Sequence, residues 1–174
     1  CLYVVHEFED VNVKDVHWNA KLIKAKFESS ILCCSFDPTC RVIAAASFDG
    51  SCKVISAIIP GIDSEVGDGP FGKINDFGTP ILEFSCYFWL NNVTWSPSGN
   101  ELCYLSHDAT LNFVKINQDD CTIKGRAEKV TLLKLPMTQG IYIDENTFVA
   151  GGFDKVPFLF KREESGWKFV KSLD

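Results

Sequence analysis

The sequence predicts an all-β fold, a partial β-propeller with about three to four blades of a presumed seven. One segment occurs three times, and each copy has two apolar strands joined by a tight turn that carries Asp49, Asp108 or Asp154. The copies recur at the period of a four-stranded blade, about 40 to 45 residues, once a long insertion between residues 57 and 80 is set aside. No helical period of useful length is present. Such units bury their faces against neighbouring copies, so consecutive blades are expected across residues 1–174.

The first 27 residues are expected to supply the two outer strands of an earlier blade. Apolar stretches at 2–7 and 18–27 are separated by a polar hairpin loop. In the second stretch, Lys24 and Lys26 alternate with apolar residues, a pattern typical of a strand with one solvated face.

Three further blades are expected after this hairpin. The first spans residues 28–86 and contains a long insertion at 59–80, whose Gly and Pro residues are incompatible with a regular ladder. The second spans 92–135, and the third spans 139–174. Because long loops in compact folds are often functional, the insertion is a candidate contact surface.

Composition and charge limit the classes of function. A net charge of −6 argues against the basic surface that nucleic-acid binding requires, so no nucleic-acid partner is expected. No apolar run approaches the roughly 18 residues of a membrane-spanning helix. Because an open arc of blades would expose a face at each end, we expect the chain to be part of a longer product that completes the ring.

The cysteines and histidines predict neither a disulfide framework nor a metal site. None of the eight cysteines forms a C-x-x-C pair, and none of the three histidines has a cysteine or second histidine at ligand spacing. We therefore expect no cofactor and no metal, in a reducing compartment. Five cysteines are predicted to be small core residues: Cys33, Cys34, Cys52, Cys86 and Cys103.

The three turn aspartates, Asp49, Asp108 and Asp154, are predicted to be structural. An Asp side chain accepts hydrogen bonds from nearby amides and fixes a tight turn, so losing one would cost about 1 to 3 kcal/mol of stability. The run Ser106-His107-Asp108 contains the residue types of a catalytic triad. However, neighbours in a strand point to opposite faces, and the other two copies have Phe in place of His107. We predict no catalytic residue and a protein that is not an enzyme.

Together these segments resemble WD-repeat propellers, although the Trp-Asp and Gly-His dipeptides that name that family are absent. A closer resemblance is to the WD-repeat subunit, subunit 1, of the actin-related protein 2/3 complex. It rests on Pro70-Phe71-Gly72 in the insertion, Trp89, and the segments at 93–96, 105–110, 149–154 and 157–160.

This resemblance, to about the middle half of the family's propeller, implies a non-catalytic scaffold in the cytoplasm and cytoskeleton. In that family the propeller binds other subunits of the complex and takes part in contacts with nucleation activators and the actin filament. These are the expected partners, and Pro70, Phe71, Gly72 and Phe77 are the candidate partner-binding residues.

Two alternatives remain open at this point. One is a WD-repeat scaffold of another cytosolic assembly, such as a vesicle coat or a ubiquitin ligase receptor. The other is a propeller hydrolase or metal-dependent enzyme, which would need convergent polar residues at one end of the channel.

Overall fold

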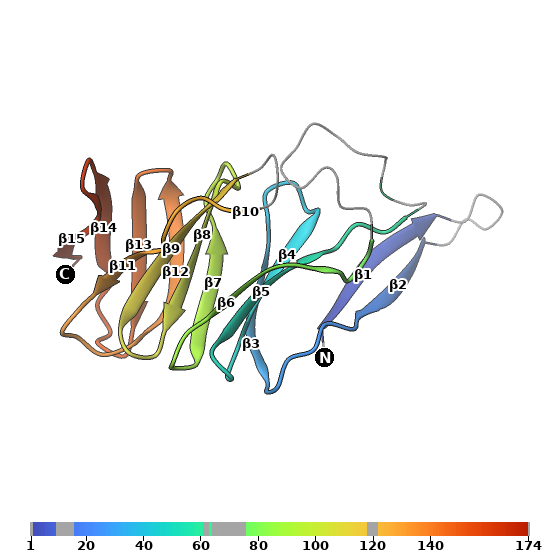
Figure 1. Ribbon diagram of the computed structural model, residues 1–174, viewed down its shortest axis with the longest axis horizontal. Helices are drawn as coiled ribbons and strands as arrows, with labels where there is room; N and C mark the ends of the chain where they lie inside the picture. The colour runs from blue at the N-terminus through green and yellow to red at the C-terminus, as the bar shows by residue number, and fades with distance from the viewer. Residues whose placement is uncertain (1, 10–15, 61–62, 64–75, 118–121, 174) are drawn as a thin grey trace.

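The computed structural model describes residues 2–9, 16–60, 63, 76–117 and 122–173, and in these ranges the chain is built from β-strands and turns. No helix in the described part is long and apolar enough to cross a membrane. The strands form a hairpin and three larger antiparallel sheets. Figure 1 shows these four units following one another along the long axis, from the blue N-terminal hairpin to the red C-terminal sheet. The prediction of an all-β fold is therefore confirmed.

The N-terminal hairpin packs against the first of the larger sheets. Strand β1 (Leu2–Glu9) pairs with β2 (Val16–Ile23) along its whole length. The predicted strand over 18–27 was too long, because the ladder ends at Ile23. Phe27 instead packs against the apolar cluster between the hairpin and the first sheet.

The three larger sheets are antiparallel meanders of consecutive strands, and in the second sheet two short outer strands both pair with the third strand. The first contains β3 (Ile31–Phe36), β4 (Val42–Ser47), β5 (Ser51–Ser56) and β6 (Pro80–Ser85). The second contains β7 (Leu90–Trp95), β8 (Glu101–Ser106), β9 (Thr110–Asn117) and β11 (Glu128–Thr131), and the short β10 (Thr122–Ile123) also pairs with β9. The third contains β12 (Met137–Asp144), β13 (Thr147–Gly152), β14 (Phe158–Glu163) and β15 (Gly166–Ser172).

The burial of the second strand in each larger sheet depends on whether neighbouring units cover one face of that sheet or both. Every residue of β4 and of β8 is buried, because each of these sheets is covered on both faces. A strand covered on both faces has apolar residues at successive positions rather than at alternate ones. In β13, buried residues alternate with half-buried ones over much of the strand. The sequences VIAAAS and ELCYLS therefore belong to the middle of the stack.

The prediction of core cysteines is right for Cys52 and Cys103 and wrong for Cys34. Cys52 and Cys103 are fully buried, and burial raises the pKa of both thiols. Cys33 and Cys86 are half-buried, whereas Cys34 is exposed. Because consecutive residues of a strand point to opposite faces, β3 cannot bury both Cys33 and Cys34 unless both of its faces are covered.

Candidate functional site

The three turn aspartates occupy equivalent places, each between the second and third strands of its sheet. The residue after each Asp has a positive φ: 81° at Gly50, 59° at Ala109 and 63° at Lys155. The three turns therefore share one backbone form, in which the position after the Asp lies in the left-handed region.

The hydrogen bonds of these aspartates differ from sheet to sheet. Oδ2 of Asp49 accepts the amides of Glu28 at 2.8 Å and Ser29 at 3.2 Å, and its Oδ1 accepts the amide of Ser51 at 2.8 Å. Oδ2 of Asp154 accepts the amide of Leu135 at 2.9 Å. Asp108 accepts no hydrogen bond from any residue in the described ranges. Three equivalent sequence positions therefore have three different surroundings.

The hydrogen bonds around Asp49 shift its titration. Partial burial acts to raise the pKa of this carboxyl, but hydrogen bonds from Ser51, Glu28 and Ser47 outweigh it and the pKa is lowered. The charged form is therefore the one that the folded turn stabilises.

A further turn aspartate was missed by the sequence analysis. Asp37 is 1% exposed, and its Oδ1 accepts the amides of Arg41 and Val42, both at 2.9 Å. It connects β3 to β4 at the opposite end of the sheet from Asp49. The signal was present in the repeat itself, because Ser96 and Asp144 occupy the equivalent positions of the other two sheets and also accept nearby amides.

Of the candidate partner-binding residues, Phe77 lies within the described residues. Pro70, Phe71 and Gly72 lie outside the described residues. Phe77 is half-buried where the insertion rejoins the first sheet, and it packs against the cluster shared by the hairpin and that sheet. The Nζ atom of Lys21 lies 4.8 Å from the centre of its ring. Part of the Phe77 ring is therefore used within the fold.

His107 is placed for packing and not for activating a nucleophile. Its ring stacks on Trp89 with a centroid distance of 4.1 Å, and its Nδ1 lies 3.2 Å from Nδ2 of Asn91. The same Asn91 nitrogen donates to the carbonyl of Met137 at 2.9 Å. His107 thus belongs to a contact between the second and third sheets.

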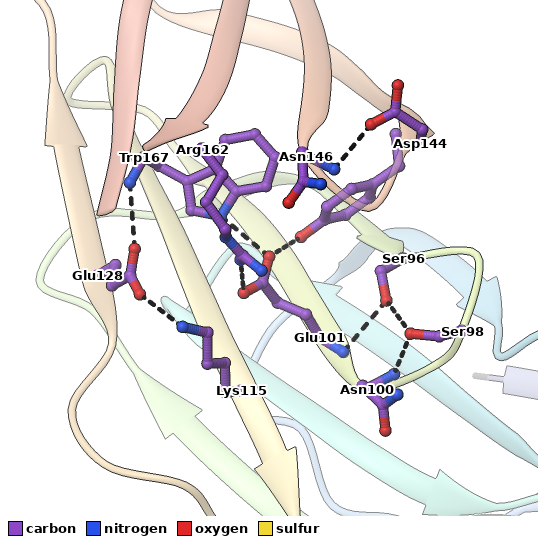
Figure 2. Close-up of polar contacts among 11 residues, drawn as sticks. Ser96, Ser98, Asn100, Glu101, Lys115, Glu128, Asp144, Asn146, Arg162 and Trp167 are labelled. Atoms are coloured by element: carbon purple, nitrogen blue, oxygen red, sulfur yellow. Dashed lines mark hydrogen bonds and ion pairs between the residues drawn. The ribbon is translucent and has the colours of Figure 1, made fainter. Parts of the chain in front are cut away.

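A buried polar network, absent from the sequence predictions, joins the same two sheets around Glu101 (Figure 2). Glu101 is 3% exposed at the start of β8. Its Oε1 accepts the hydroxyl of Tyr142 at 2.8 Å and the indole N–H of Trp167 at 3.0 Å, and its Oε2 forms an ion pair with Arg162. The Arg162 guanidinium also lies 4.8 Å from the Trp167 ring. Donors from β12, β14 and β15 thus converge on one carboxylate of β8.

A second carboxylate extends this network toward the surface. Glu128 on β11 accepts Nζ of Lys115 at 3.0 Å and the amide of Trp167 at 3.1 Å (Figure 2). Burial acts to raise the pKa of Glu128, but the bonds from Lys115 and Trp167 outweigh it and the pKa is lowered. Burial is also the main reason that the pKa of Tyr142 is raised, which keeps its hydroxyl protonated as a donor to Glu101.

An open groove of about 550 Å³ runs along the inner strands β3, β7 and β12. Its lining includes Cys33, Asn92, Gln139 and Ile141, and its described lining residues carry no charged side chain. Asn92 donates to Oε1 of Gln139 at 3.1 Å, while its buried Oδ1 has no partner among the described residues. In the described part of the chain, no three His, Cys, Asp or Glu residues are grouped as metal ligands. The groove is therefore an uncharged and mostly apolar surface.

Comparison with known proteins identifies the repeat and the relatives of the chain. The family model for the WD domain, G-beta repeat, matches residues 21–56. Subunit 1A of the actin-related protein 2/3 complex from Arabidopsis thaliana is 33% identical over 90% of this chain, and subunit 1A-B from Xenopus laevis is 32% identical over the same share. Subunit 1 from Saccharomyces cerevisiae is 31% identical, again over 90% of the chain. The chain spans about two fifths of the length of these curated relatives, 41%, 42% and 40% respectively.

Solved structures support the same fold. The WD40 repeats of RRP9 align with a TM-score of 0.62 at 13% identity, covering 86% of this chain and 40% of that one. The β-propeller domain of Cps50 (Swd1) from Myceliophteria thermophila aligns with a TM-score of 0.61 at 13% identity, covering 86% of this chain and 39% of that one. At this identity the likeness concerns the fold alone. The predicted fold and resemblance are both confirmed: the chain has a partial, WD-repeat-like β-propeller fold, a WD repeat is matched at residues 21–56, and the chain is similar to part of subunit 1 of the actin-related protein 2/3 complex.

Proposed function

We propose that this chain is part of a non-catalytic scaffold subunit of an actin-nucleating complex, the actin-related protein 2/3 complex. The observation that carries the proposal is the similarity to subunit 1 from a plant, a frog and a yeast, at 31–33% identity over 90% of the chain. In this role the protein supports branched filament nucleation through contacts with the other subunits, with nucleation activators and with the actin filament. Its place is the cytoplasm, at the actin cytoskeleton.

The architecture supports a scaffold because neighbouring sheets are fixed to one another. A protein that aligns several partners has to keep its binding surfaces at constant relative positions, and apolar clusters with buried polar contacts provide that rigidity. The first and second sheets share one such cluster, while the second and third share another together with the Glu101 network. The uncharged lining of the groove gives no reason to add a catalytic role.

We further infer the division of the chain into blades and the location of one contact surface. Residues 1–27 supply strands of an earlier blade, and 28–86, 92–135 and 139–174 each form one blade. The insertion at 59–80, with Pro70, Phe71, Gly72 and the accessible part of Phe77, contacts a neighbouring subunit. The turn residues Asp49, Asp108 and Asp154 contribute to stability.

Co-purification tests the assembly. The full-length protein is tagged in its own cells and purified gently, and its stoichiometric companions are identified by mass spectrometry. Two actin-related proteins among them are the expected result. Vesicle-coat subunits or ubiquitin ligase subunits in their place would leave the propeller standing and refute the proposed assembly.

The contact surface is tested in the same purification. Phe71→Ala is expected to reduce the recovery of at least one companion without changing the thermal unfolding of the protein. Tyr3→Ala is the control, because Tyr3 is a large exposed aromatic side chain on the N-terminal hairpin, 54% exposed and outside the insertion. Equal recovery with both variants would remove Phe71 from the proposed contact.

A further inference from the structure

A continuous strip of aromatic rings crosses the turns of all three larger sheets. Phe48 stacks on Trp89 with a centroid distance of 5.0 Å, Trp89 stacks on His107 at 4.1 Å, and His107 meets Phe153 edge to face at 6.0 Å. These residues come from the β4–β5 turn, the β6–β7 link, the β8–β9 turn and the β13–β14 turn. Only the assembled sheets bring the four rings together, so the strip is a property of the folded molecule.

The strip is unusually exposed for so many large apolar side chains. Phe48 is 50% exposed and Phe153 is 55% exposed. In the β6–β7 link, Tyr87 is 96% exposed and Phe88 is 42% exposed, and the two rings contact each other edge to face at 5.3 Å. Exposed apolar patches of this kind mark interaction sites more often than scattered apolar residues do.

Carboxylates lie along the strip, since an aspartate follows each of Phe48, His107 and Phe153 in the sequence. No Lys or Arg of the described ranges forms an ion pair with Asp49, Asp108 or Asp154. Asp49 and Asp154 accept backbone amides, as described above. Asp108 accepts no hydrogen bond from a described residue and is exposed. Its carboxylate is therefore the one with capacity for an external donor.

Asp108 lies beside the link that carries Tyr87 and Phe88. The amide of His107, the residue before Asp108, donates to the carbonyl of Trp89 at 3.0 Å, and the two rings stack, so the β8–β9 turn is fixed against the β6–β7 link. The amide of Cys86 also donates to the carbonyl of Gly50 at 2.8 Å, so the link is fixed against the β4–β5 turn. The turn that carries Asp108 is therefore fixed beside the segment that carries two exposed rings.

We propose that this surface is a docking site for an extended segment of a partner protein that carries an arginine, with its guanidinium on the rings of Tyr87 and Phe88 and paired with Asp108. A planar guanidinium group can stack on an aromatic face and pair with a carboxylate at the same time. The more strongly hydrated ammonium group of lysine does this less well. The molecule already contains this combination in its interior, where Arg162 lies over Trp167 and pairs with Glu101. The proposal goes beyond the proposed function, because it concerns the side chain bound and applies in any assembly.

A peptide titration tests the proposal on the purified full-length protein. The probes are fluorescein-labelled Gly-Ser-Arg-Ser-Gly and the same peptide with citrulline, which keeps the shape of arginine and removes its charge. Fluorescence anisotropy is expected to show binding of the arginine peptide that is at least about tenfold tighter than that of the citrulline peptide. Asp108→Asn and Tyr87→Ser should each weaken the arginine peptide by about fivefold or more.

The control variant is Glu164→Gln, which also removes one exposed carboxylate. Glu164 lies in the turn after β14, whereas the aromatic strip crosses the turn before β14, next to Asp154. The control residue is therefore at the other end of that strand from the strip. Unchanged affinity in this variant supports a specific site, and an equal loss would show a general effect of negative charge and overturn the proposal. Equal binding of the two peptides, or no measurable binding of either, would also overturn it.

If the protein instead self-associates and Tyr87→Ser abolishes that self-association, the occupant is a second copy and the arginine proposal is wrong. Each of these outcomes is independent of which proteins co-purify.

Discussion

The middle sheet contacts its two neighbours in different ways. Toward the first sheet, the cluster around Val42, Val54, Leu90 and Leu102 is apolar, and the indole N–H of Trp95 donates to the carbonyl of Ser35 at 3.1 Å. Toward the third sheet, an apolar cluster of similar kind surrounds the carboxylate of Glu101 and its three donors.

The apolar contacts mainly stabilise the packing of the sheets, whereas the buried carboxylate also fixes their relative orientation. Apolar contacts are non-directional, so they bring sheets together without strongly selecting one relative position. A buried carboxylate is satisfied only when its donors are correctly placed, and any displacement leaves charge unpaired in the interior. We infer that the second interface is the more sensitive of the two to small changes in geometry.

The largest expected effect comes from removing the carboxylate of Glu101. Glu101→Ala leaves Arg162 without its buried partner, and also removes the acceptor for Tyr142 and Trp167. Breaking a buried ion pair in this way costs about 3 to 5 kcal/mol. Urea denaturation of the full-length protein measures it, with Glu163→Ala as the control because the pair between Glu163 and Lys168 is exposed. A loss as small as that of the control would contradict the asymmetry between the interfaces.

The second largest effect is expected from crowding the interface between the second and third sheets. A Cβ atom at Gly140 would lie 2.6 Å from Cζ of Phe148, whose side chain is fully buried and has no room to move. Gly140→Ala should therefore cost about 1 to 3 kcal/mol. Gly151→Ala on the paired strand β13 is the control, because its Cβ would meet only the Cα of Pro157 at 3.8 Å. Equal unfolding midpoints for the two variants would show that the interface adjusts.

The sequence allowed the sheets to be predicted but not this contact between them. The strands follow from a local frame that occurs three times, so each copy supports the reading of the others. Glu101 and Trp167 are distant in sequence, and their bond depends on how two sheets pack. The local signal was a carboxylate at the start of the largely apolar strand ELCYLS. Likewise, the repeat predicted equivalent turns at Asp49 and Asp108, but not which amides each carboxylate meets.

A pair of tryptophan substitutions compares one hydrogen bond from each interface. Trp95→Phe removes a bond to a neutral carbonyl and is expected to lose about 0.5 to 1.5 kcal/mol from that bond. Trp167→Phe removes a bond to a buried carboxylate, for which about 1.5 to 3 kcal/mol is expected. Both rings are nearly buried, at 6% and 5% exposure, so the loss of packing is similar. Thermal unfolding of the two variants gives the difference, and a larger loss for Trp95→Phe would reverse the ranking of the interfaces.

The smallest expected effect is the pH dependence of stability that arises from the turn aspartates Asp49 and Asp108. The folded state lowers the pKa of Asp49 from its ordinary value of 3.8. A lowered carboxyl pKa contributes stability that is present above 3.8 and is lost as the pH falls through the folded value. Asp49→Asn should therefore cost less than about 1 kcal/mol near neutral pH, which is below the range expected from the sequence, because the group is exposed to solvent. Its difference from the natural protein should shrink below pH 3.8.

Asp108→Asn provides the matched comparison, since Asp108 occupies the same turn position and accepts no hydrogen bond from the described residues. Its difference from the natural protein should be smaller than that of Asp49→Asn at every pH. Urea midpoints measured from pH 7 down to pH 3 distinguish the two variants. Equal losses near neutral pH would mean that the turn position itself, and not the amides that Asp49 accepts, sets the contribution of these aspartates. The two sides of the middle sheet would then differ only in their buried interfaces, because the interface with the first sheet has no counterpart of the Glu101 network among the described residues.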